Sequence, residues 1–336
     1  MFEYVGNLHV HSRYSDGRRS IEEISKVAAE ERLDFIGIND HNDLCGLEEY
    51  GEGWRRGVFV LIGEEIGIAR HHYIAYGIGR AVQPDEGNPQ KVIDEVKQAG
   101  GIGFMAHPHE RGSPLDSRGK AYTWDDWSVT GYTGISIWCH GSGWKGTATN
   151  IFTAIYNYYH HRWSFTGPYP ETLAAFDAES RRRDVSLIGA SDAHEFQLGK
   201  WPFRVCIFPY AVSFRAVNMH LVLRKPLTGD DEADRSTILA ALAAGNGFVG
   251  YDALRNSRGF RFGAAWHGGN ANMGDEVELR DGITLEVKSP ARGVVRIVHN
   301  GTRVFEALSE TASYEVKQPG VYRAEVMSLH KLHKPR

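Results

Sequence analysis

Residues 7–17 read Asn7-Leu8-His9-Val10-His11-Ser12-Arg13-Tyr14-Ser15-Asp16-Gly17. The rest of the chain is organised around this stretch, in which a strand ends in residues of metal-binding type. The preceding residues, 2–8, are apolar and aromatic enough to enter a core as a strand. Side chains two apart in a strand share a face, so we expect His9 and His11 to point the same way. Two such imidazoles, with Asp16 nearby, can hold a divalent cation. A single His-x-His pair also arises by chance, so the prediction depends on similar strand ends elsewhere.

Composition narrows the class of protein. At 336 residues the chain is long enough for one large domain and one small domain. Its net charge of -4 gives no reason to expect nucleic acid or an anionic membrane as a partner. The three scattered cysteines, Cys45, Cys139 and Cys206, form no disulfide framework and suit a reducing compartment. No long apolar run or signal-like N-terminus is present, so we expect a cytoplasmic protein.

Apolar runs alternate with capped helical segments over the first three quarters of the chain. Strands are expected at 2–8, 33–38, 58–62, 71–77, 102–106, 134–138, 184–190 and 203–208. Helices are expected at 21–32, 88–100, 149–163, 170–183 and 234–244. This alternation predicts an α/β fold with a parallel sheet that closes into a TIM-like barrel.

The sequence pattern changes from about residue 264. Short strands separated by turn signals are expected at 275–279, 283–287, 294–299, 303–305, 314–316 and 321–327. They predict a small antiparallel β domain, sandwich-like in form. We therefore expect a barrel over residues 1–262 and a β domain over residues 263–336.

Residues of metal-binding type follow at least five of the barrel strands. They are His9 and His11, His41, Glu65, His107, and Asp192 with His194. The carboxyl ends of barrel strands share one face, so these side chains are expected to converge. A mixture of imidazoles and carboxylates suits Zn²⁺, Mn²⁺ or Fe²⁺. The set exceeds the needs of one ion and predicts two or three ions, with Glu65 and Asp192 as bridges.

These motifs resemble the PHP (polymerase and histidinol phosphatase) family of metal-dependent phosphoesterases, over roughly residues 4–210. The resemblance rests on His9-Val10-His11-Ser12 with Ser15-Asp16-Gly17, Asn39-Asp40-His41-Asn42-Asp43, Gly63-Glu64-Glu65, Ala106-His107-Pro108 and Ser191-Asp192-Ala193-His194. The chain looks most similar to the CehA/McbA-type branch, in which a histidine-led strand follows the Gly-Glu-Glu segment. Alternation places only one of His71 and His72 inside, and the resemblance favours His72.

The resemblance implies a distorted (β/α)₇ barrel with a trinuclear centre. Its implied ligands are His9, His11, Asp16, His41, Glu65, His72, His107, Asp192 and His194. Among these, Glu65, Asp192 and His194 would carry the catalytic role, and Asp40 would hold an imidazole. A metal-bridging hydroxide would attack the phosphoryl group, so no serine or cysteine nucleophile is needed.

The sequence leaves the other residues of the substrate site undetermined. His109 and His140 are candidates for the general acid, and Arg111, Lys200 and Arg204 are candidates for phosphate binding. The alternative for each of them is an ordinary surface or packing role. The aromatic-rich region 122–169 could form a lid, although core or dimer contacts are the preferred interpretation. The family often has Ile-Glu, an aromatic and Asn where this chain has residues 135–140, and this departure leaves the substrate open.

We therefore predict a metal-dependent phosphoesterase acting on a small phosphorylated metabolite or nucleotide. One alternative is a carboxylate-ester or carbamate hydrolase with the same metal site. Another is a non-catalytic, metal-stabilised binding scaffold, for which chelation would unfold the protein. The sequence does not determine the metal, the substrate, homo-oligomer formation or the role of the β domain.

Overall fold

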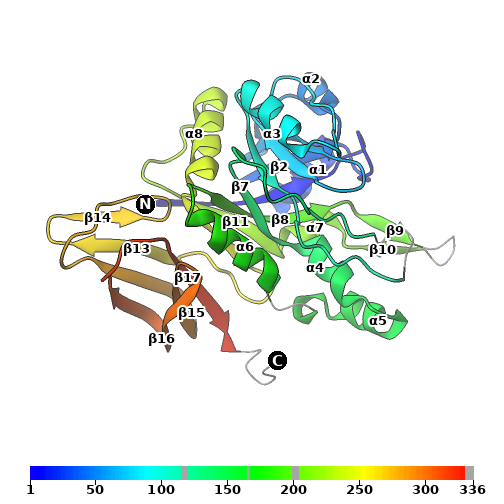
Figure 1. The fold of residues 1–336 in the computed structure, drawn as a ribbon. Helices are drawn as coiled ribbons and strands as arrows, with labels where there is room; N and C mark the ends of the chain where they lie inside the picture. The colour runs from blue at the N-terminus through cyan, green and yellow to red at the C-terminus, as the bar shows by residue number, and fades with distance from the viewer. Residues whose placement is uncertain (116–119, 165–166, 199–203, 330–336) are drawn as a thin grey trace.

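The computed structural model describes residues 1–115, 120–164, 167–198 and 204–329. A barrel with surrounding helices forms the larger part, and a curved antiparallel sheet follows it in the chain (Figure 1). The expected α/β class with a C-terminal antiparallel β region is therefore confirmed.

Seven strands close the barrel. Hydrogen bonds connect them in the order β1-β2-β4-β5-β6-β7-β8, and β8 returns to pair with β1. Their bounds are β1 Phe2–Val10, β2 Phe35–His41, β4 Val58–Ile66, β5 Tyr73–Tyr76, β6 Ile102–Met105, β7 Gly134–Cys139 and β8 Ser186–Ala193. Because β8 pairs with β1 only at Leu8 and Val10, the ring closes near the carboxyl end of β1. The barrel is distorted, as expected.

The expectation of a wholly parallel barrel is wrong at β5. This strand pairs antiparallel with both β4 and β6. Only residues 67–72 connect β4 to β5. A parallel pairing needs a crossover of about a dozen residues or more, and this connection is too short for one.

The amino-terminal half of β1 has a different neighbour. Residues 2–6 pair antiparallel with β11 (Val217–Leu223), which in turn pairs with β12 (Gly247–Tyr251). These two strands were not expected from the sequence. The expected barrel strand at 203–208 is instead β10 (Val205–Ile207), which pairs with β9 (Phe196–Leu198) in a separate hairpin. Residue 203 lies outside the described residues. The short β3 (Gly53–Arg55) extends the sheet beside β4.

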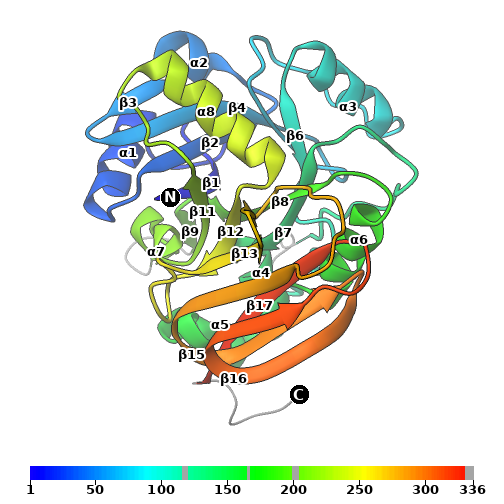
Figure 2. The ribbon, with the colours of Figure 1, turned by 90° about the vertical axis from the view of Figure 1, so that its left-hand side faces the viewer.

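Helices pack around the barrel: in Figure 2, α1 and α3 lie to the left and right of the strands, and α8 crosses in front of them. Their bounds are α1 Ile21–Glu30, α2 Cys45–Glu49, α3 Pro89–Gln98, α4 His140–Thr147, α5 Ile151–Tyr159, the 3₁₀ helix η1 His161–Trp163, α6 Pro170–Ser180, α7 Tyr210–Phe214 and α8 Asp231–Ala244. The expected capping box at Ser20 and Glu23 is present. Gly245 ends α8 in the left-handed region, with φ of 70°. Within the described ranges, no helix has both the length and the apolar character needed to cross a membrane.

Side-chain alternation along β4 separates two apolar layers. Phe59 and Leu61 belong to the cluster inside the barrel, which also contains residues of α8. Val58, Val60 and Ile62 belong to the cluster that packs against the outer helices. This alternation places Glu65 on the inner face of β4 and Glu64 on its outer face.

The C-terminal part is one antiparallel sheet of five strands. They are β13 Arg261–Trp266, β14 Gly269–Asn272, β15 Thr284–His299, β16 Thr302–Glu315 and β17 Tyr322–Ser328. Several expected short strands merge into the long β15 and β16, and the expected strand at 275–279 is not a strand. One face of β15, β16 and β17 forms a separate apolar core. The domain boundary between residues 262 and 263 stays a prediction, and β13 runs across it.

His220 on β11 is buried between two carboxylates. Its Nδ1 lies 2.9 Å from Glu3 and its Nε2 lies 3.0 Å from Asp252, while Arg261 pairs with Glu3 at 2.6 Å. Burial alone would lower the pKa of His220, but hydrogen bonds to Asp252 and Glu3 raise it above 6.5. Folding therefore gains stability from this proton below pH 6.5, and the gain is lost as pH rises through the higher folded pKa.

We expect His220→Gln to lower the free energy of unfolding by about 3 kcal/mol at pH 6, because it removes one member of a buried ionic cluster. The difference from the wild type should shrink as pH rises to 9. Denaturant titrations of both proteins at several pH values measure it. A difference that stayed constant with pH would contradict the assigned role of the His220 proton.

Candidate metal centre

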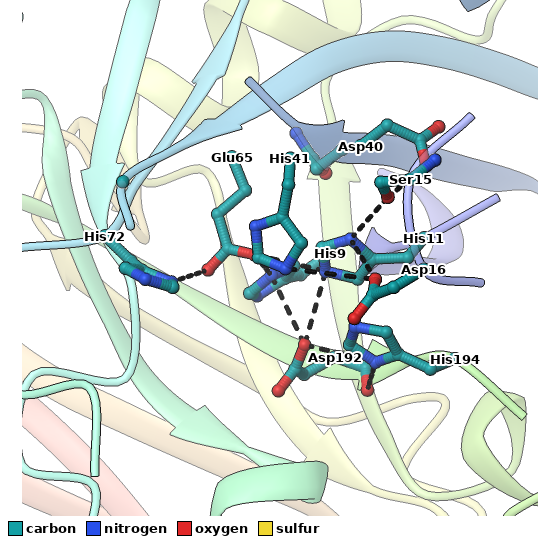
Figure 3. Close-up of polar contacts among 12 residues, drawn as sticks. His9, His11, Ser15, Asp16, Asp40, His41, Glu65, His72, Asp192 and His194 are labelled. Carbon is teal, nitrogen blue, oxygen red and sulfur yellow. Dashed lines mark hydrogen bonds and ion pairs between the residues drawn. The ribbon is translucent and has the colours of Figure 1, made fainter. Parts of the chain in front are cut away.

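The nine predicted ligands meet at the carboxyl-terminal end of the barrel, and all of them except His107 are labelled in Figure 3. Eight of them form three groups in which the potential ligand atoms lie within 4.8 Å of one another. The groups are His11, Asp16, His41 and His194; His9, His11, Glu65 and Asp192; and His41, Glu65 and His72. The ninth residue, His107, has its Nε2 3.2 Å from Glu65 Oε1.

Glu65 lies between two sets of imidazoles because its two oxygens face different ways. Oε2 lies 2.8 Å from His9 Nε2 and 3.3 Å from His41 Nδ1. Oε1 lies 2.7 Å from His72 Nδ1 and 3.2 Å from His107 Nε2. The side chain has an exposed fraction of 1%. A carboxylate in this position can contact two cations at once.

Asp192 and Asp16 complete the other two groups. Asp192 Oδ1 lies 3.5 Å from His9 Nε2 and 3.3 Å from His11 Nε2. Asp16 Oδ1 lies 3.0 Å from His194 Nε2. The Nδ1 atom of His194 lies 2.9 Å from the carbonyl oxygen of Asp192, a contact that leaves Nε2 for a ligand. Asp16 is 48% exposed, so this edge of the centre is open to solvent.

Three of these residues have unusual backbone conformations. The φ angles of His9, His107 and Asp192 are 65°, 29° and 55°. Residues other than glycine rarely adopt positive φ, and such conformations recur at functional sites. At His9 the register of β1 shifts, so Leu8 lies in the inner apolar cluster and Val10 in the outer one. The shift turns His9 inward, and without it regular alternation from Leu8 would point this side chain outward.

Asp40 holds the loop that carries Asp16. Its oxygens accept hydrogen bonds from the Ser12 backbone N–H at 2.8 Å and from the Ser12 and Ser15 hydroxyls at 2.6 Å each. Asp40 was expected to hold an imidazole, and in the structure it approaches one through Ser15. The Ser15 hydroxyl lies between this carboxylate and His11, 3.5 Å from its Nδ1.

The electrostatics of the centre suit a cation. Burial alone would raise the pKa of Glu65, but the neighbouring histidines, led by His9 and His72, hold it well below its usual range. The pKa of Asp192 is likewise held well below its usual range, against the effect of burial. Among the described residues, His9 Nε2 and His11 Nε2 lie buried at 2.8 and 3.2 Å from Glu65 Oε2, yet none of the three atoms makes a well-directed hydrogen bond. Such atoms are costly unless a partner binds them, and divalent cations bind this donor set.

The two general-acid candidates lie in different surroundings. The Nδ1 atom of His109 is 3.0 Å from the Thr172 hydroxyl, and its ring stacks on Trp127. His140, the first residue of α4, is completely buried with its ring centroid 4.7 Å from that of Phe208. Burial lowers the pKa of His140 to about 3, so this ring is neutral at pH 7. Their roles in proton transfer stay predictions.

In the part of the chain that the structure describes, neither Arg111 nor Arg204 forms an ion pair with a carboxylate of the centre. Arg111 is exposed and pairs with Glu171 at 3.0 Å, and its guanidinium lies over the Tyr169 ring. Arg204 is exposed. Lys200 lies outside the described residues. Their predicted contacts with substrate stay predictions.

The aromatic-rich region 122–169 divides between three environments. Trp124 is buried, with 3% exposed. Phe152 and Tyr159 on α5 are 80% and 72% exposed. Tyr122 contacts the centre itself, with its ring centroid 4.7 Å from that of His72. Packing and site contacts therefore occur together in this region.

Sequence reasoning missed two charged residues beside the centre, Glu110 and Lys145. Glu110 is buried, with one oxygen 3.8 Å from His107 Nδ1 and the other 2.7 Å from Lys145 Nζ. Glu110 lies three residues after His107, and this proximity to a motif was a usable signal. Lys145 lies in a glycine-rich segment without periodicity, and no local pattern indicated its position.

Comparison with known proteins gives three similarities. Residues 7–161 match the model of the PHP domain family. The chain is 30% identical over 115 residues to an uncharacterized protein of Methanocaldococcus jannaschii, a match that covers 31% of this chain and 67% of that protein. It is 25% identical over 134 residues to a 3′,5′-nucleoside bisphosphate phosphatase of Chromobacterium violaceum, covering 40% of this chain and 43% of that one. The match therefore spans less than half the length of the phosphatase.

Among solved structures, the chain is similar to a two-domain protein from Bacteroides vulgatus, described as containing a predicted PHP-like metal-dependent phosphoesterase. The sequences are 13% identical with a TM-score of 0.46, and the alignment covers 96% of this chain and 85% of that one.

Proposed function

The chain belongs to the PHP domain family, and on that premise we propose that it hydrolyses a small phosphorylated metabolite or nucleotide at a centre of two or three metal ions. The observation that carries this proposal is the position of Glu65. Its two oxygens contact separate sets of imidazoles, as a bridge between two cations would.

Each of the three groups supplies three or four ligand atoms, and Glu65, His11 and His41 each belong to two groups. Imidazole and carboxylate donors suit Zn²⁺, Mn²⁺ or Fe²⁺. When bound, such ions lower the pKa of water and take up charge that develops on phosphoryl oxygens.

The protein's own residues would hold and orient this centre. Glu65 would fix the separation of its two halves, while Asp192 and His194 would hold the side that faces Asp16. The groups contain three carboxylates, so three divalent cations would leave a net positive charge that favours a phosphate anion. The exposed edge at Asp16 gives a substrate access, which a purely structural metal site does not need.

We propose that the chain belongs to the CehA/McbA-type branch. The segment after Gly63-Glu64-Glu65 leads directly to His72, and β5 then pairs antiparallel with β4. The relative from Chromobacterium violaceum acts on nucleoside bisphosphates, and this makes a phosphorylated nucleoside a reasonable first substrate to test.

The test compares hydrolysis of 4-nitrophenyl phosphate, bis(4-nitrophenyl) phosphate and 4-nitrophenyl acetate by protein loaded with Mn²⁺ or Zn²⁺. We expect a phosphoester to be hydrolysed at least about 10²-fold faster by the wild type than by His9→Ala, because the variant loses a ligand-type imidazole. Metal content is measured on both proteins to confirm the loss.

The alternatives predict other outcomes. Hydrolysis of the acetate alone would replace the phosphoesterase with a carboxylate-ester or carbamate hydrolase. No turnover of any ester, together with unfolding on chelation, would support the metal-stabilised scaffold.

A further inference from the structure

Lys145 on α4 is a cation placed at the edge of the metal centre. Its Nζ donates a hydrogen bond to Glu110 Oε1 at 2.7 Å. The side chain is 22% exposed, whereas that of Glu110 is 0% exposed. Charged side chains such as that of Glu110 are rarely buried unless they are paired, and Lys145 supplies this pairing from a partly exposed position.

The face of α4 that carries Lys145 lies against the centre. A Cβ atom built on Gly141 would lie 3.2 Å from Asp192 Oδ2, so this turn of the helix touches the carboxylate closely. Lys145 is four residues further along the helix, on the same face as Gly141. The ammonium group of Lys145 and the Asp192 carboxylate also attract each other electrostatically.

The partners of Lys145 approach the centre from a second side. Glu110 accepts a hydrogen bond from the Tyr122 backbone N–H at 2.9 Å and lies 3.8 Å from His107 Nδ1. The ammonium lies 5.3 Å from the centroid of the Tyr122 ring, which itself packs on His72. Lys145 therefore lies beside the half of the centre that contains His72 and His107.

An ammonium group has three hydrogen-bond donors, and within the described residues Glu110 is the one acceptor bonded to Lys145. Two donors remain on a side chain that reaches solvent beside a group of metal-binding residues. A phosphoryl oxygen is a strong acceptor for such donors, and lysine is a common phosphate ligand. A neutral ester offers no comparable charge.

We propose that Lys145, held in place by Glu110, binds a phosphoryl oxygen of the substrate and selects anionic phosphoesters over neutral esters at this centre. The proposal rests on the proposed hydrolase function and adds the charge class of the substrate. The simpler interpretation is that the Lys145–Glu110 pair only fastens α4 to the residues around Glu110 and Tyr122. The two interpretations differ in phosphate affinity.

The test uses inorganic phosphate as the probe and full-length protein loaded with Mn²⁺. Lys145→Met alone would leave Glu110 buried without its cation, so the main variant is Lys145→Met with Glu110→Gln. Lys91→Met is the matched control, because Lys91 on α3 also pairs with a carboxylate, Asp85, at 3.4 Å. Calorimetric titration gives the phosphate Kd, and metal content and melting temperature are measured on every variant.

We expect the phosphate Kd of the double variant to rise about 10- to 100-fold, the usual effect of losing one charge-assisted hydrogen bond. Its bound metal should match the wild type, and its kcat/KM ratio of phosphoester to acetate should fall by a similar factor. Lys91→Met should change none of these values.

An unchanged Kd with a lower melting temperature would overturn the proposal and leave Lys145 with a fastening role. That result, obtained on a wild type that hydrolyses phosphoesters, would leave the phosphoesterase assignment intact. A wild type that hydrolyses only the acetate and does not bind phosphate would overturn both. Because the phosphate titration does not require turnover, it separates the two failures.

Discussion

Glu65→Gln is expected to reduce phosphoester turnover by about 10³-fold, the size of effect seen when a preorganised electrostatic group is lost from an active site. The substitution keeps the size of the side chain and removes its negative charge. It also replaces one acceptor oxygen by an amide group that can only donate. Either Oε1 or Oε2 then loses its ability to bind a cation, so one half of the centre should empty.

Metal content measured by mass spectrometry on the purified variant checks this expectation independently of the assay. We expect fewer ions per chain than in the wild type under identical loading. A variant that kept all its metal and most of its turnover would contradict a bridging role for Glu65.

The neighbouring residue provides a matched control. Glu64 is also buried on β4, but it lies on the outer face and accepts a hydrogen bond from the Val82 backbone N–H at 2.9 Å. Burial raises its pKa to about 7, so about half of these side chains are already uncharged at pH 7. Glu64→Gln should therefore keep the metal content and turnover of the wild type. The same substitution at two adjacent glutamates then shows whether the effect depends on the position of Glu65 in the metal centre.

Much of this site could be predicted because it follows from local patterns. The apolar runs that precede His41 and Glu65 are strands, and both residues lie at or near strand ends as expected. Strand ends in a barrel share one face, so widely separated residues could be placed together from the sequence. Asp16 was selected because it lies close to His11 in the sequence, and the resemblance added His72, which no strand-end rule selects.

Other features depend on tertiary structure, and the sequence does not contain them locally. His9 and His11 point the same way, but His9 does so through a register shift in β1 that alternation does not reveal. The run 217–223 has the apolar character of a strand, so its existence was predictable, whereas its pairing with the start of β1 was not. The position of Lys145 depends on how α4 packs against Asp192.

Gly63→Ala is expected to be the most damaging small substitution near the centre. Gly63 lies on the inner face of β4, two residues before Glu65, and pairs with Tyr76 of β5. A Cβ atom at this position would lie 2.0 Å from the backbone oxygen of Ala75 and 2.7 Å from the Tyr76 ring. A backbone atom in a hydrogen-bonded strand cannot move away without disturbing the pairing of β4 and β5.

We expect Gly63→Ala to lower the free energy of unfolding by about 3 kcal/mol, at the upper end of overpacking effects, and the melting temperature by about 5–10 °C. Turnover should fall as well, because a shift of β4 away from β5 separates Glu65 from His72, which the β4–β5 connection carries at its end. Gly79→Ala is the control, since a Cβ atom on Gly79 would meet nothing within 4 Å. Thermal unfolding and turnover measured on both variants decide the matter. Equal stability of the two would show that β5 can yield, and the rigid coupling of β4, β5 and Glu65 inferred from the close approach at Gly63 would then be wrong.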